Sequence, residues 1–272
     1  MFELKVFSGR AHPEFAREIC RHLGVNLGDA DIFKFSNDNT FVKINENVRE
    51  SDVFVVQPSC HPVNDGLMEL LIMIDALKRA SARRITAVLP YFPYVRSDKK
   101  DQPRIPITAR LVADLLEVAG IDRVLTLDLH APQVQGFFRV PVDHLTAIPI
   151  LAEHYKRKGW GDLVVVAPDA GRARMARTYA EWLKAPIAII DKRRDGNDEQ
   201  AAADHLIGDV RGRRALVIDD EVSSGGSLAA VARTLYAHGA AEVYAAATHP
   251  VLSGQAMQKL VEAGVRELAV TN

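Results

Sequence analysis

The chain has 272 residues, a length that suits two domains of ordinary size better than one. Hydrophobic residues make up 48% of it, enough for buried cores, and charged residues make up 25%, as is ordinary for a soluble protein. The formal net charge is −1 and there is no lysine- or arginine-rich tail, so the composition argues against a general role in binding nucleic acid or a membrane surface.

The amino terminus and the cysteines predict a cytoplasmic protein. The first residues, MFELKVFSGR, contain charges and lack the apolar stretch of a signal peptide. No window approaches the roughly 18 apolar residues that a membrane span needs. Cys20 and Cys60 are widely spaced and form no metal-binding or disulfide pattern, which fits a reducing compartment. We expect both to be small, buried apolar side chains.

Short apolar, β-branched runs alternate with helical patterns along most of the chain. Strands are predicted at residues 4–7, 52–57, 85–89, 124–128, 163–167, 187–190, 215–218 and 243–247. Helices, with apolar residues at helical spacing, are predicted at residues 14–23, 66–79, 108–119, 148–158, 172–184, 227–238 and 254–263. Near-continuous apolar strands that alternate with helices are typical of parallel sheets covered on both faces.

Two parts of the chain repeat the same order of elements. Residues 52–94 read strand, loop, helix, strand and loop, and residues 162–191 read the same way. We therefore predict two related α/β domains, residues 1–146 and 147–272, with FFRVPVDHLTAIP as the crossover between them. Parallel α/β sheets bind ligands at the carboxyl ends of their strands, so the loops at those ends are the candidates for chemistry.

The segment YFPYVRSDKKDQPRIPITAR directly follows a predicted strand and concentrates charge. Its charged side chains before the next helix are Arg96, Asp98, Lys99, Lys100, Asp101 and Arg104. Such a loop can hold a polyphosphate while its acids orient the arginines or a metal-bound water. A charged run is also typical of a solvated surface, and composition alone favours that interpretation.

A glycine- and serine-rich loop follows the predicted strand 215–218. From the strand end to the helix it contains Asp219, Asp220, Ser223, Ser224, Gly225, Gly226 and Ser227. The glycines let backbone amides approach a ligand, the serines add donors, and the helix begins near Ser227 with a partial positive charge. Together they predict a cradle for a phosphate monoester, with the aspartates near sugar hydroxyls or a metal. The alternative is an ordinary strand-to-helix turn with an N-cap serine.

This loop resembles the phosphoribosyl-binding motif shared by phosphoribosyltransferases and ribose-phosphate pyrophosphokinases. The run FPYVRSDKKDQPR, followed by PITARLVADLLEVAGIDRVLTLDLHAPQVQGFF, closely resembles the signature region of ribose-phosphate pyrophosphokinases. The likeness covers nearly the whole chain, from FKFSN through NDGLMELLIMIDALKRASA to IDDEVSSGGS. It implies an α/β fold of two phosphoribosyltransferase-like domains, each a mainly parallel sheet flanked by helices.

The resemblance also implies a reaction. It is transfer of the β,γ-diphosphoryl group of ATP to the 1-hydroxyl of ribose 5-phosphate, giving 5-phosphoribosyl 1-diphosphate and AMP. ATP would bind on the side of the first domain and ribose 5-phosphate on the side of the second. The implied metal is Mg²⁺, which suits hard oxygen ligands and water. The implied assembly is a homo-oligomer, a hexamer built from dimers, in which a neighbouring subunit completes the adenine pocket.

The resemblance assigns roles to individual residues. Lys192 and Arg194, in a polar stretch predicted to be a mobile loop, match cations that stabilise charge on the transferred phosphoryl group. His130 matches a contact to the metal–ATP complex, and Asp169 matches an acid that engages Mg²⁺ at the ribose end. The ATP-binding residues that it implies are Phe35, Asn37, Asn39, Arg96, Ser97 and Asp98. From the residues alone, Phe35 is more typical of a core and a lone histidine of a structural role.

The chain departs from the family pattern at several positions. Asn37 and Asn39 stand where the family commonly has aspartate and glutamate, Ser97 where glutamine is common, and Ser223 where aspartate is frequent. The family usually continues through a further helical unit after the strand predicted at 267–271. Two alternative functions stay open. One is a phosphoribosyltransferase, which would consume the diphosphate, and the other is a non-catalytic regulatory homologue, which should have lost the loop cations or the metal contacts.

Overall fold

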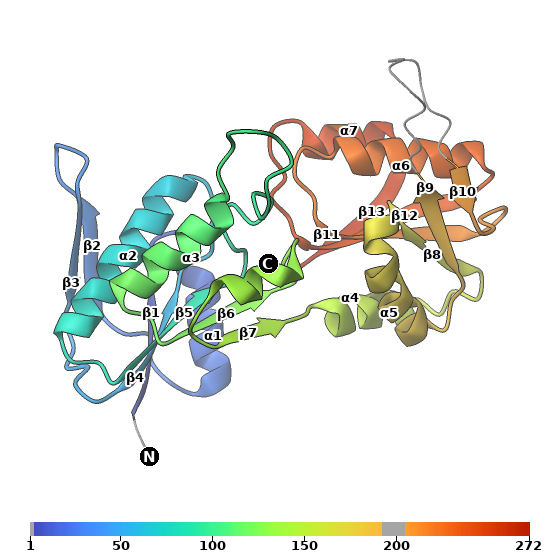
Figure 1. The fold of residues 1–272 in the computed structure, drawn as a ribbon. Coiled ribbons are helices and arrows are strands. Elements are labelled where there is room, and N and C mark those ends of the chain that lie inside the picture. Colours follow the sequence, from blue (N-terminus) through green and yellow to red (C-terminus); the bar gives the residue numbers. More distant parts are fainter. Residues whose placement is uncertain (1–2, 192–204) are drawn as a thin grey trace. The chain divides into compact units, whose positions relative to one another are not determined.

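The computed structural model describes residues 3–191 and 205–272. It divides the chain into two compact units, Met1–Leu145 and Thr146–Asn272 (Figure 1). Each unit has a mainly parallel sheet with helices on both faces, which confirms the predicted fold class. Lys192 and Arg194 lie outside the described residues. Among the residues that are described, no helix has both the length and the apolar character needed to cross a membrane.

The sheet of the first unit has the order β1-β4-β5-β6-β7, with every neighbouring pair parallel. These strands are β1 (Leu4–Ser8), β4 (Asp52–Val56), β5 (Arg84–Leu89), β6 (Arg123–Leu127) and β7 (Val142–Leu145). The helices of this unit are α1 (Pro13–Leu23), α2 (Val63–Arg79), α3 (Thr108–Ala119) and the short 3₁₀ helix η1 (Pro132–Phe137). Apolar residues of α2 and α3 pack on one face of the sheet, and those of α1 pack on the other.

A separate antiparallel hairpin in the first unit consists of β2 (Ala30–Lys34) and β3 (Thr40–Ile44). The hairpin lies beside α2 (Figure 1). Its inner side chains pack against the core cluster that α2 helps to form; they are Ala30, Ile32, Val42 and Ile44. The hairpin was not among the predicted strands, because charged and apolar residues alternate in it instead of forming a continuous apolar run. It carries Phe35 at the end of β2.

The sheet of the second unit has the order β10-β9-β8-β11-β12-β13, parallel except for the β10–β9 pair. The strands are β8 (Leu163–Ala167), β9 (Ile187–Asp191), β10 (His205–Ile207), β11 (Arg214–Glu221), β12 (Glu242–His249) and β13 (Val265–Val270). The helices are α4 (Ile148–Lys156), η2 (Ala170–Arg172), α5 (Ala173–Leu183), α6 (Gly226–Ala237) and α7 (Ala256–Glu262). Helices α4 and α5 cover one face and α6 and α7 the other (Figure 1).

The predicted strands and helices are all present, with ends displaced by a few residues. The repeated order is confirmed as β4-α2-β5 and β8-α5-β9. The segment expected to join the two domains, residues 137–149, contains the boundary between the units, and it also contains strand β7, which pairs with β6. Pro141 can precede this strand because its carbonyl accepts the N–H of Val124 at 3.0 Å. The expectation that both cysteines are buried is wrong. Cys20 is buried as expected, but Cys60 is exposed because it lies in the loop after β4.

Candidate functional site

In the second unit, β11 carries the two aspartates predicted to line the phosphate cradle. The strand continues to Glu221, so Asp219 and Asp220 lie within it, as two of its last three residues, instead of following it. The extension has a partner, because β12 is equally long and Asp219 lies opposite Ala247 in the parallel register. Both carboxylates are therefore held by strand backbone at the carboxyl edge of the sheet, where ligands of parallel α/β sheets bind.

The glycine-rich loop ends at Gly225, the N-cap residue of helix α6. Gly225 has a φ of 74°, and a Cβ added to it would lie 2.9 Å from the carbonyl oxygen of Ala256, so only glycine fits without distortion. No side chain of the described residues caps this helix, so the alternative of an N-cap serine is wrong. Because Gly226 and Ser227 are exposed, the N–H groups and partial positive charge of the first turn are accessible to an anion.

The loop between β12 and α7, together with α7 itself, supports the glycine-rich loop at Ser223 and Ser224. The N–H of Ser253 donates to the carbonyl of Ser223 at 3.1 Å, and the two hydroxyls lie 3.4 Å apart. The Nζ of Lys259 donates to the carbonyl of Ser224 at 3.4 Å. Sequence reasoning did not single out this supporting loop. Its signal was the run HPVLSG, in which proline, serine and glycine directly follow a buried strand.

Arg172 joins the two aspartates to the neighbouring loop. Its Nε donates to Oδ1 of Asp219 at 3.0 Å, and its Nη2 forms an ion pair with Oδ1 of Asp220 at 2.6 Å. The side chain of Asp220 is 1% exposed and that of Arg172 is 15% exposed. Burial raises the pKa of Asp219, the adjacent Asp220 adds to the rise, and Arg172 opposes it. Two adjacent carboxyl groups thus share one guanidinium, and the raised pKa of Asp219 means that burial and the neighbouring acid oppose a second negative charge beside Asp220.

Asp169 lies on the loop after β8, the strand next to β11. Its carboxylate accepts the N–H of Arg172 at 3.1 Å and caps η2. The side chain is exposed. The structure thus brings Asp169, Asp219 and Asp220 to the same edge of one sheet, with Arg172 in contact with all three. Sequence reasoning noted Arg172 only as part of the run GRAR, since nothing local indicates that its partners lie on another strand.

In the first unit, hydrogen bonds to α3 and η1 hold the charged segment after β5 in place. Arg96 is exposed. The hydroxyl of Ser97 accepts the N–H of Thr108 at 3.2 Å, and its carbonyl accepts the N–H of Ala109 at 3.1 Å, so Ser97 anchors the beginning of α3. Asp98 accepts a hydrogen bond from the side chain of Gln133 in η1. Arg96 and its neighbours are therefore presented by a segment with a defined backbone.

His130 follows β6, in a segment that the next strand holds in place. The N–H of Leu129 donates to Nε2 of His144 on β7 at 2.9 Å. The other ring nitrogen of His144 lies 3.2 Å from the side-chain amide of Gln135. Burial lowers the pKa of His144, so the folded state favours the neutral ring that can accept this hydrogen bond. His144 is a support that sequence reasoning missed.

Phe35, Asn37 and Asn39 lie in the turn of the β2–β3 hairpin. The N–H of Phe35 donates to the carbonyl of Asn39 at 2.9 Å, and the N–H of Asn39 donates to Oδ1 of Asn37 at 3.3 Å. The ring of Phe35 contacts those of Phe33 and Phe41, with centroids 5.3 and 5.7 Å away. Phe35 is nevertheless half exposed, so it is not the core residue that the bare sequence favours. It offers an open aromatic face on which a planar ring can stack.

Two family models match the chain. One, described as the N-terminal domain of ribose phosphate pyrophosphokinase, covers residues 4–120. The other, described as a phosphoribosyl transferase domain, covers residues 145–268. The first match lies within the first unit, and the second begins at Leu145, the last residue of the first unit, and otherwise lies within the second unit.

Individual relatives agree with the family models. The ribose-phosphate pyrophosphokinase of Caldanaerobacter subterraneus subsp. tengcongensis is 52% identical over 99% of this chain and 85% of its own length. That of Corynebacterium ammoniagenes is 50% identical over 99% of this chain and 84% of its own. The crystal structure of phosphoribosylpyrophosphate synthetase from Mycobacterium smegmatis aligns with a TM-score of 0.92 and 47% identity, covering 99% of this chain and 89% of that one.

Proposed function

The chain belongs to the ribose-phosphate pyrophosphokinase family, and from that premise we propose its substrates and the roles of its residues. It transfers the β,γ-diphosphoryl group of Mg-ATP to the 1-hydroxyl of ribose 5-phosphate, giving 5-phosphoribosyl 1-diphosphate and AMP. ATP binds to the domain of residues 1–146, and ribose 5-phosphate binds to the domain of residues 147–272.

The observation that carries this proposal is the start of α6: the helix follows Gly225, and no side chain of the described residues caps its first N–H groups. The 5-phosphate of the ribose binds to the N–H groups of the first turn, helped by the hydroxyls of Ser223, Ser224 and Ser227. A phosphate monoester suits this position because it brings negative charge and several acceptor oxygens to donors that have no side-chain cap. Gly226 adds to the fit, since it has no side chain to obstruct the approach.

The acids beside the cradle hold the sugar and the metal. Asp219 and Asp220 accept hydrogen bonds from ribose hydroxyls, and Arg172 keeps both carboxylates in place. Asp169, exposed on the adjacent loop, offers the hard oxygen that Mg²⁺ prefers. The imidazole of His130 is a less common ligand for Mg²⁺ and better suited to a hydrogen bond with a phosphate oxygen or a metal-bound water. Mg²⁺ supplies charge neutralisation for the phosphates when it is bound.

The nucleotide is held by residues of the first domain. Phe35 stacks on the adenine, which its half-exposed ring permits, and the side chains of Asn37 and Asn39 read the edge of the base. Arg96 contacts the phosphates with its exposed guanidinium. Ser97 and Asp98 complete this segment, and their hydrogen bonds to Thr108 and Gln133 stabilise its backbone.

In the reaction, the 1-oxygen of the ribose attacks the β-phosphorus of ATP. A bond forms between that oxygen and the β-phosphorus, the bond from the β-phosphorus to the bridging oxygen of AMP breaks, and the hydroxyl proton leaves to solvent. Positioning and charge stabilisation are the main means by which a protein accelerates such a transfer. Lys192 and Arg194 stabilise the charge that develops on the transferred group. The enzyme acts in the cytoplasm as a homo-oligomer, a hexamer built from dimers.

The proposal is tested by incubating the purified protein with Mg²⁺, ATP and ribose 5-phosphate and separating the products by chromatography. ATP labelled at the β-phosphorus distinguishes the reactions, because diphosphoryl transfer moves the label into 5-phosphoribosyl 1-diphosphate and leaves unlabelled AMP. Transfer of a single phosphoryl group would keep the label in ADP. The variant Lys192→Ala should lose most of the activity. Lys156→Ala, an exposed lysine at the end of α4, is the matched control and should keep it.

The two alternatives give different results in the same assay. A phosphoribosyltransferase would form no AMP from ATP and would release diphosphate from 5-phosphoribosyl 1-diphosphate when a nucleobase is supplied. A non-catalytic regulatory homologue would form no AMP under any phosphate or nucleotide condition. Ribose-dependent AMP that is lost in Lys192→Ala but kept in Lys156→Ala would exclude both.

A further inference from the structure

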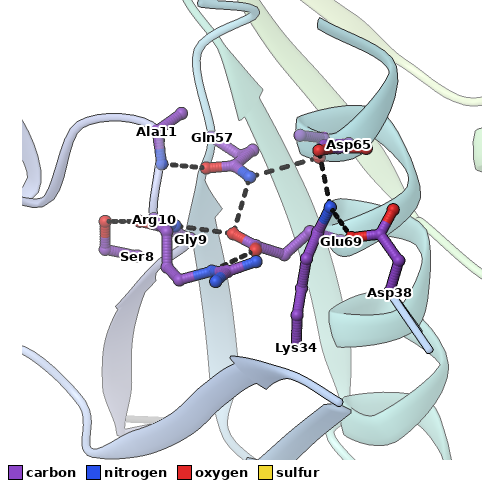
Figure 2. A network of polar contacts seen from close by, with 10 residues as sticks. Ser8, Gly9, Arg10, Ala11, Lys34, Asp38, Gln57, Asp65 and Glu69 are labelled. Atoms are coloured by element: carbon purple, nitrogen blue, oxygen red, sulfur yellow. Dashed lines mark hydrogen bonds and ion pairs between the residues drawn. The ribbon is translucent and has the colours of Figure 1, made fainter. Parts of the chain in front are cut away.

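A buried carboxylate on α2 connects two loops at the carboxyl edge of the first unit's sheet (Figure 2). Oε1 of Glu69 accepts the N–H of Arg10 at 2.6 Å and Nε2 of Gln57 at 2.9 Å, while Oε2 accepts Nε of Arg10 at 2.6 Å. Gln57 extends the network, because its Oε1 accepts the N–H of Ala11 at 3.2 Å and its Nε2 donates to the carbonyl of Gly66 at 3.1 Å. The segments after β1 and β4 are thus both bonded to α2.

This network tolerates little displacement. The side chain of Glu69 is 3% exposed, and a buried carboxylate is stable only while donors surround it. Gln57 is equally buried. A Cβ added to Gly9 would lie 2.2 Å from Oε1 of Gln57, so the segment after β1 approaches the glutamine as closely as glycine allows. The network therefore fixes the position of the first turns of α2 relative to the sheet.

The first turn of α2 makes two further contacts, each to a different segment. Asn64 accepts a hydrogen bond from the hydroxyl of Tyr94. Asp65 forms an ion pair with Nζ of Lys34 at 2.7 Å, and the same Nζ lies 2.7 Å from Oδ1 of Asp38 (Figure 2). Tyr94 belongs to the segment after β5, and Asp38 belongs to the hairpin turn. The first turn of α2 is therefore bonded to the segment after β5, through Tyr94, and to the hairpin, through Lys34.

These two segments are the ones that carry the proposed nucleotide contacts. Arg96 lies two residues after Tyr94, and Phe35 directly follows Lys34. The segment after β5 and the Glu69 network also share an edge of the sheet, because β4 and β5 are neighbours and the N–H of Gln57 donates to the carbonyl of Val88 at 3.0 Å. The order of contacts runs from Glu69 through the first turn of α2 to both segments.

We propose that Glu69 is a positioning residue for nucleotide binding, which acts through the first turn of α2 to hold the Arg96 segment and the Phe35 hairpin in a fixed relation. The ligand in this inference, ATP, rests on the proposed function. The mechanical connection between Glu69 and the two segments does not, and it can be measured on the free protein.

The principal variant is Glu69→Gln, which keeps the size of the side chain but replaces one acceptor oxygen by a donor. Its amide cannot accept all three hydrogen bonds. The matched control is Asp75→Asn, also on α2, which removes an exposed ion pair with Arg79 (2.7 Å) far from the first turn. We expect Glu69→Gln to raise the KM for ATP by roughly 2- to 30-fold, the range for changes that act on a site through intermediate contacts, and Asp75→Asn to leave it unchanged. The KM for ribose 5-phosphate and kcat should change much less in both variants.

The second readout is amide hydrogen exchange of the protein without ligand. Glu69→Gln should accelerate exchange in residues 33–41 and 91–98, and Asp75→Asn should not. Tyr94→Phe, which removes one hydroxyl and preserves the ring, should accelerate exchange in residues 91–98 alone. This mild variant keeps the inference testable if Glu69→Gln folds poorly.

The outcomes separate this inference from the proposed function. Unchanged exchange in both segments of Glu69→Gln, or an equal loss of affinity for ATP and for ribose 5-phosphate, would overturn the positioning role. If the wild-type protein neither binds ATP nor forms AMP while exchange responds as expected, the proposed function fails and the positioning of the two segments by Glu69 stands.

Discussion

Gly225 is the residue of the glycine-rich loop whose backbone conformation restricts the side chain most strongly. Alanine at a φ of 74° costs about 1–2 kcal/mol, because its Cβ approaches the following carbonyl oxygen. The same Cβ would also lie 2.9 Å from the carbonyl oxygen and 3.1 Å from the Cα of Ala256. Since these are backbone atoms, they cannot rotate away, and the beginning of α7 has to move. We therefore expect Gly225→Ala to lower the free energy of unfolding of the second unit by at least about 1–2 kcal/mol.

The neighbouring glycine provides the control. A Cβ at Gly226 would meet only Oγ of Ser224, at 3.8 Å, and Gly226 lies in the first turn of a helix. Gly226→Ala should therefore leave stability unchanged or raise it by about 0.4–1 kcal/mol. Both tryptophans, Trp160 and Trp182, lie in the second unit, so urea unfolding followed by tryptophan fluorescence reports on that unit. Equal midpoints for the two variants would refute the steric argument.

The same experiment probes the ligand. Ribose 5-phosphate should raise the unfolding midpoint of the wild-type protein, because a ligand that binds only the folded state stabilises it. The rise should be smaller for Gly225→Ala, since the displaced loop presents its N–H groups less well. An equal rise of the unfolding midpoint in both proteins would mean that the phosphate binds outside the glycine-rich loop.

Two further predictions concern charged and titrating groups. Arg172→Met leaves the carboxylates of Asp219 and Asp220 without its guanidinium and should destabilise the second unit by about 3–5 kcal/mol, measured by the same fluorescence assay. Adding Asp220→Asn should recover much of the loss, and a double variant no more stable than the single one would contradict the pairing. Burial lowers the pKa of His144, so the folded state resists a proton that the unfolded chain accepts below pH of about 6.5. Stability of the first unit should therefore be full above that pH and fall below it, and the amide of Leu129 should become less protected relative to its intrinsic exchange rate at each pH. The variant His144→Gln should show a smaller pH dependence of stability, and equal slopes for the two proteins would contradict this.

The elements that were predicted correctly are those whose pattern is complete within a few residues. The run LVVVA of β8 is apolar throughout, and it is buried throughout because helices cover both faces of its sheet. The two missed elements of the first unit lack that pattern. Strand β7 is only VDHL and follows a proline, and its backbone pairing with β6 is what makes it a strand. The hairpin strand ADIFK has one face toward α2 and one exposed, so its alternation is short and weak.

In the candidate site, too, the sequence predicted the features whose residues are neighbours in the chain and missed the contacts between residues far apart in the chain. The loop from Ser223 to Ser227 was readable because glycines, serines and a helix start lie side by side in the sequence. Arg172 and Asp219 are 47 residues apart, and Arg10 and Glu69 are 59 residues apart, so no local pattern predicts that they meet. Only the order of the strands, which brings β8 beside β11 and β1 beside β4, makes these contacts possible.

This difference predicts how the two binding regions respond to substitution. The proposed recognition of a phosphate at the start of α6 relies on backbone N–H groups, so most side-chain changes in that loop should alter affinity modestly unless they alter backbone conformation, as at Gly225. The proposed nucleotide contacts of the first unit come from two segments that are both bonded to the first turn of α2, so their relative position depends on side chains outside the proposed site. A buried carboxylate with three donors can hold such a position more firmly than exposed ion pairs of the kind formed by Lys34, because solvent screens the latter. Substitutions at Glu69 should therefore affect nucleotide binding more than substitutions of many residues nearer to the ligand.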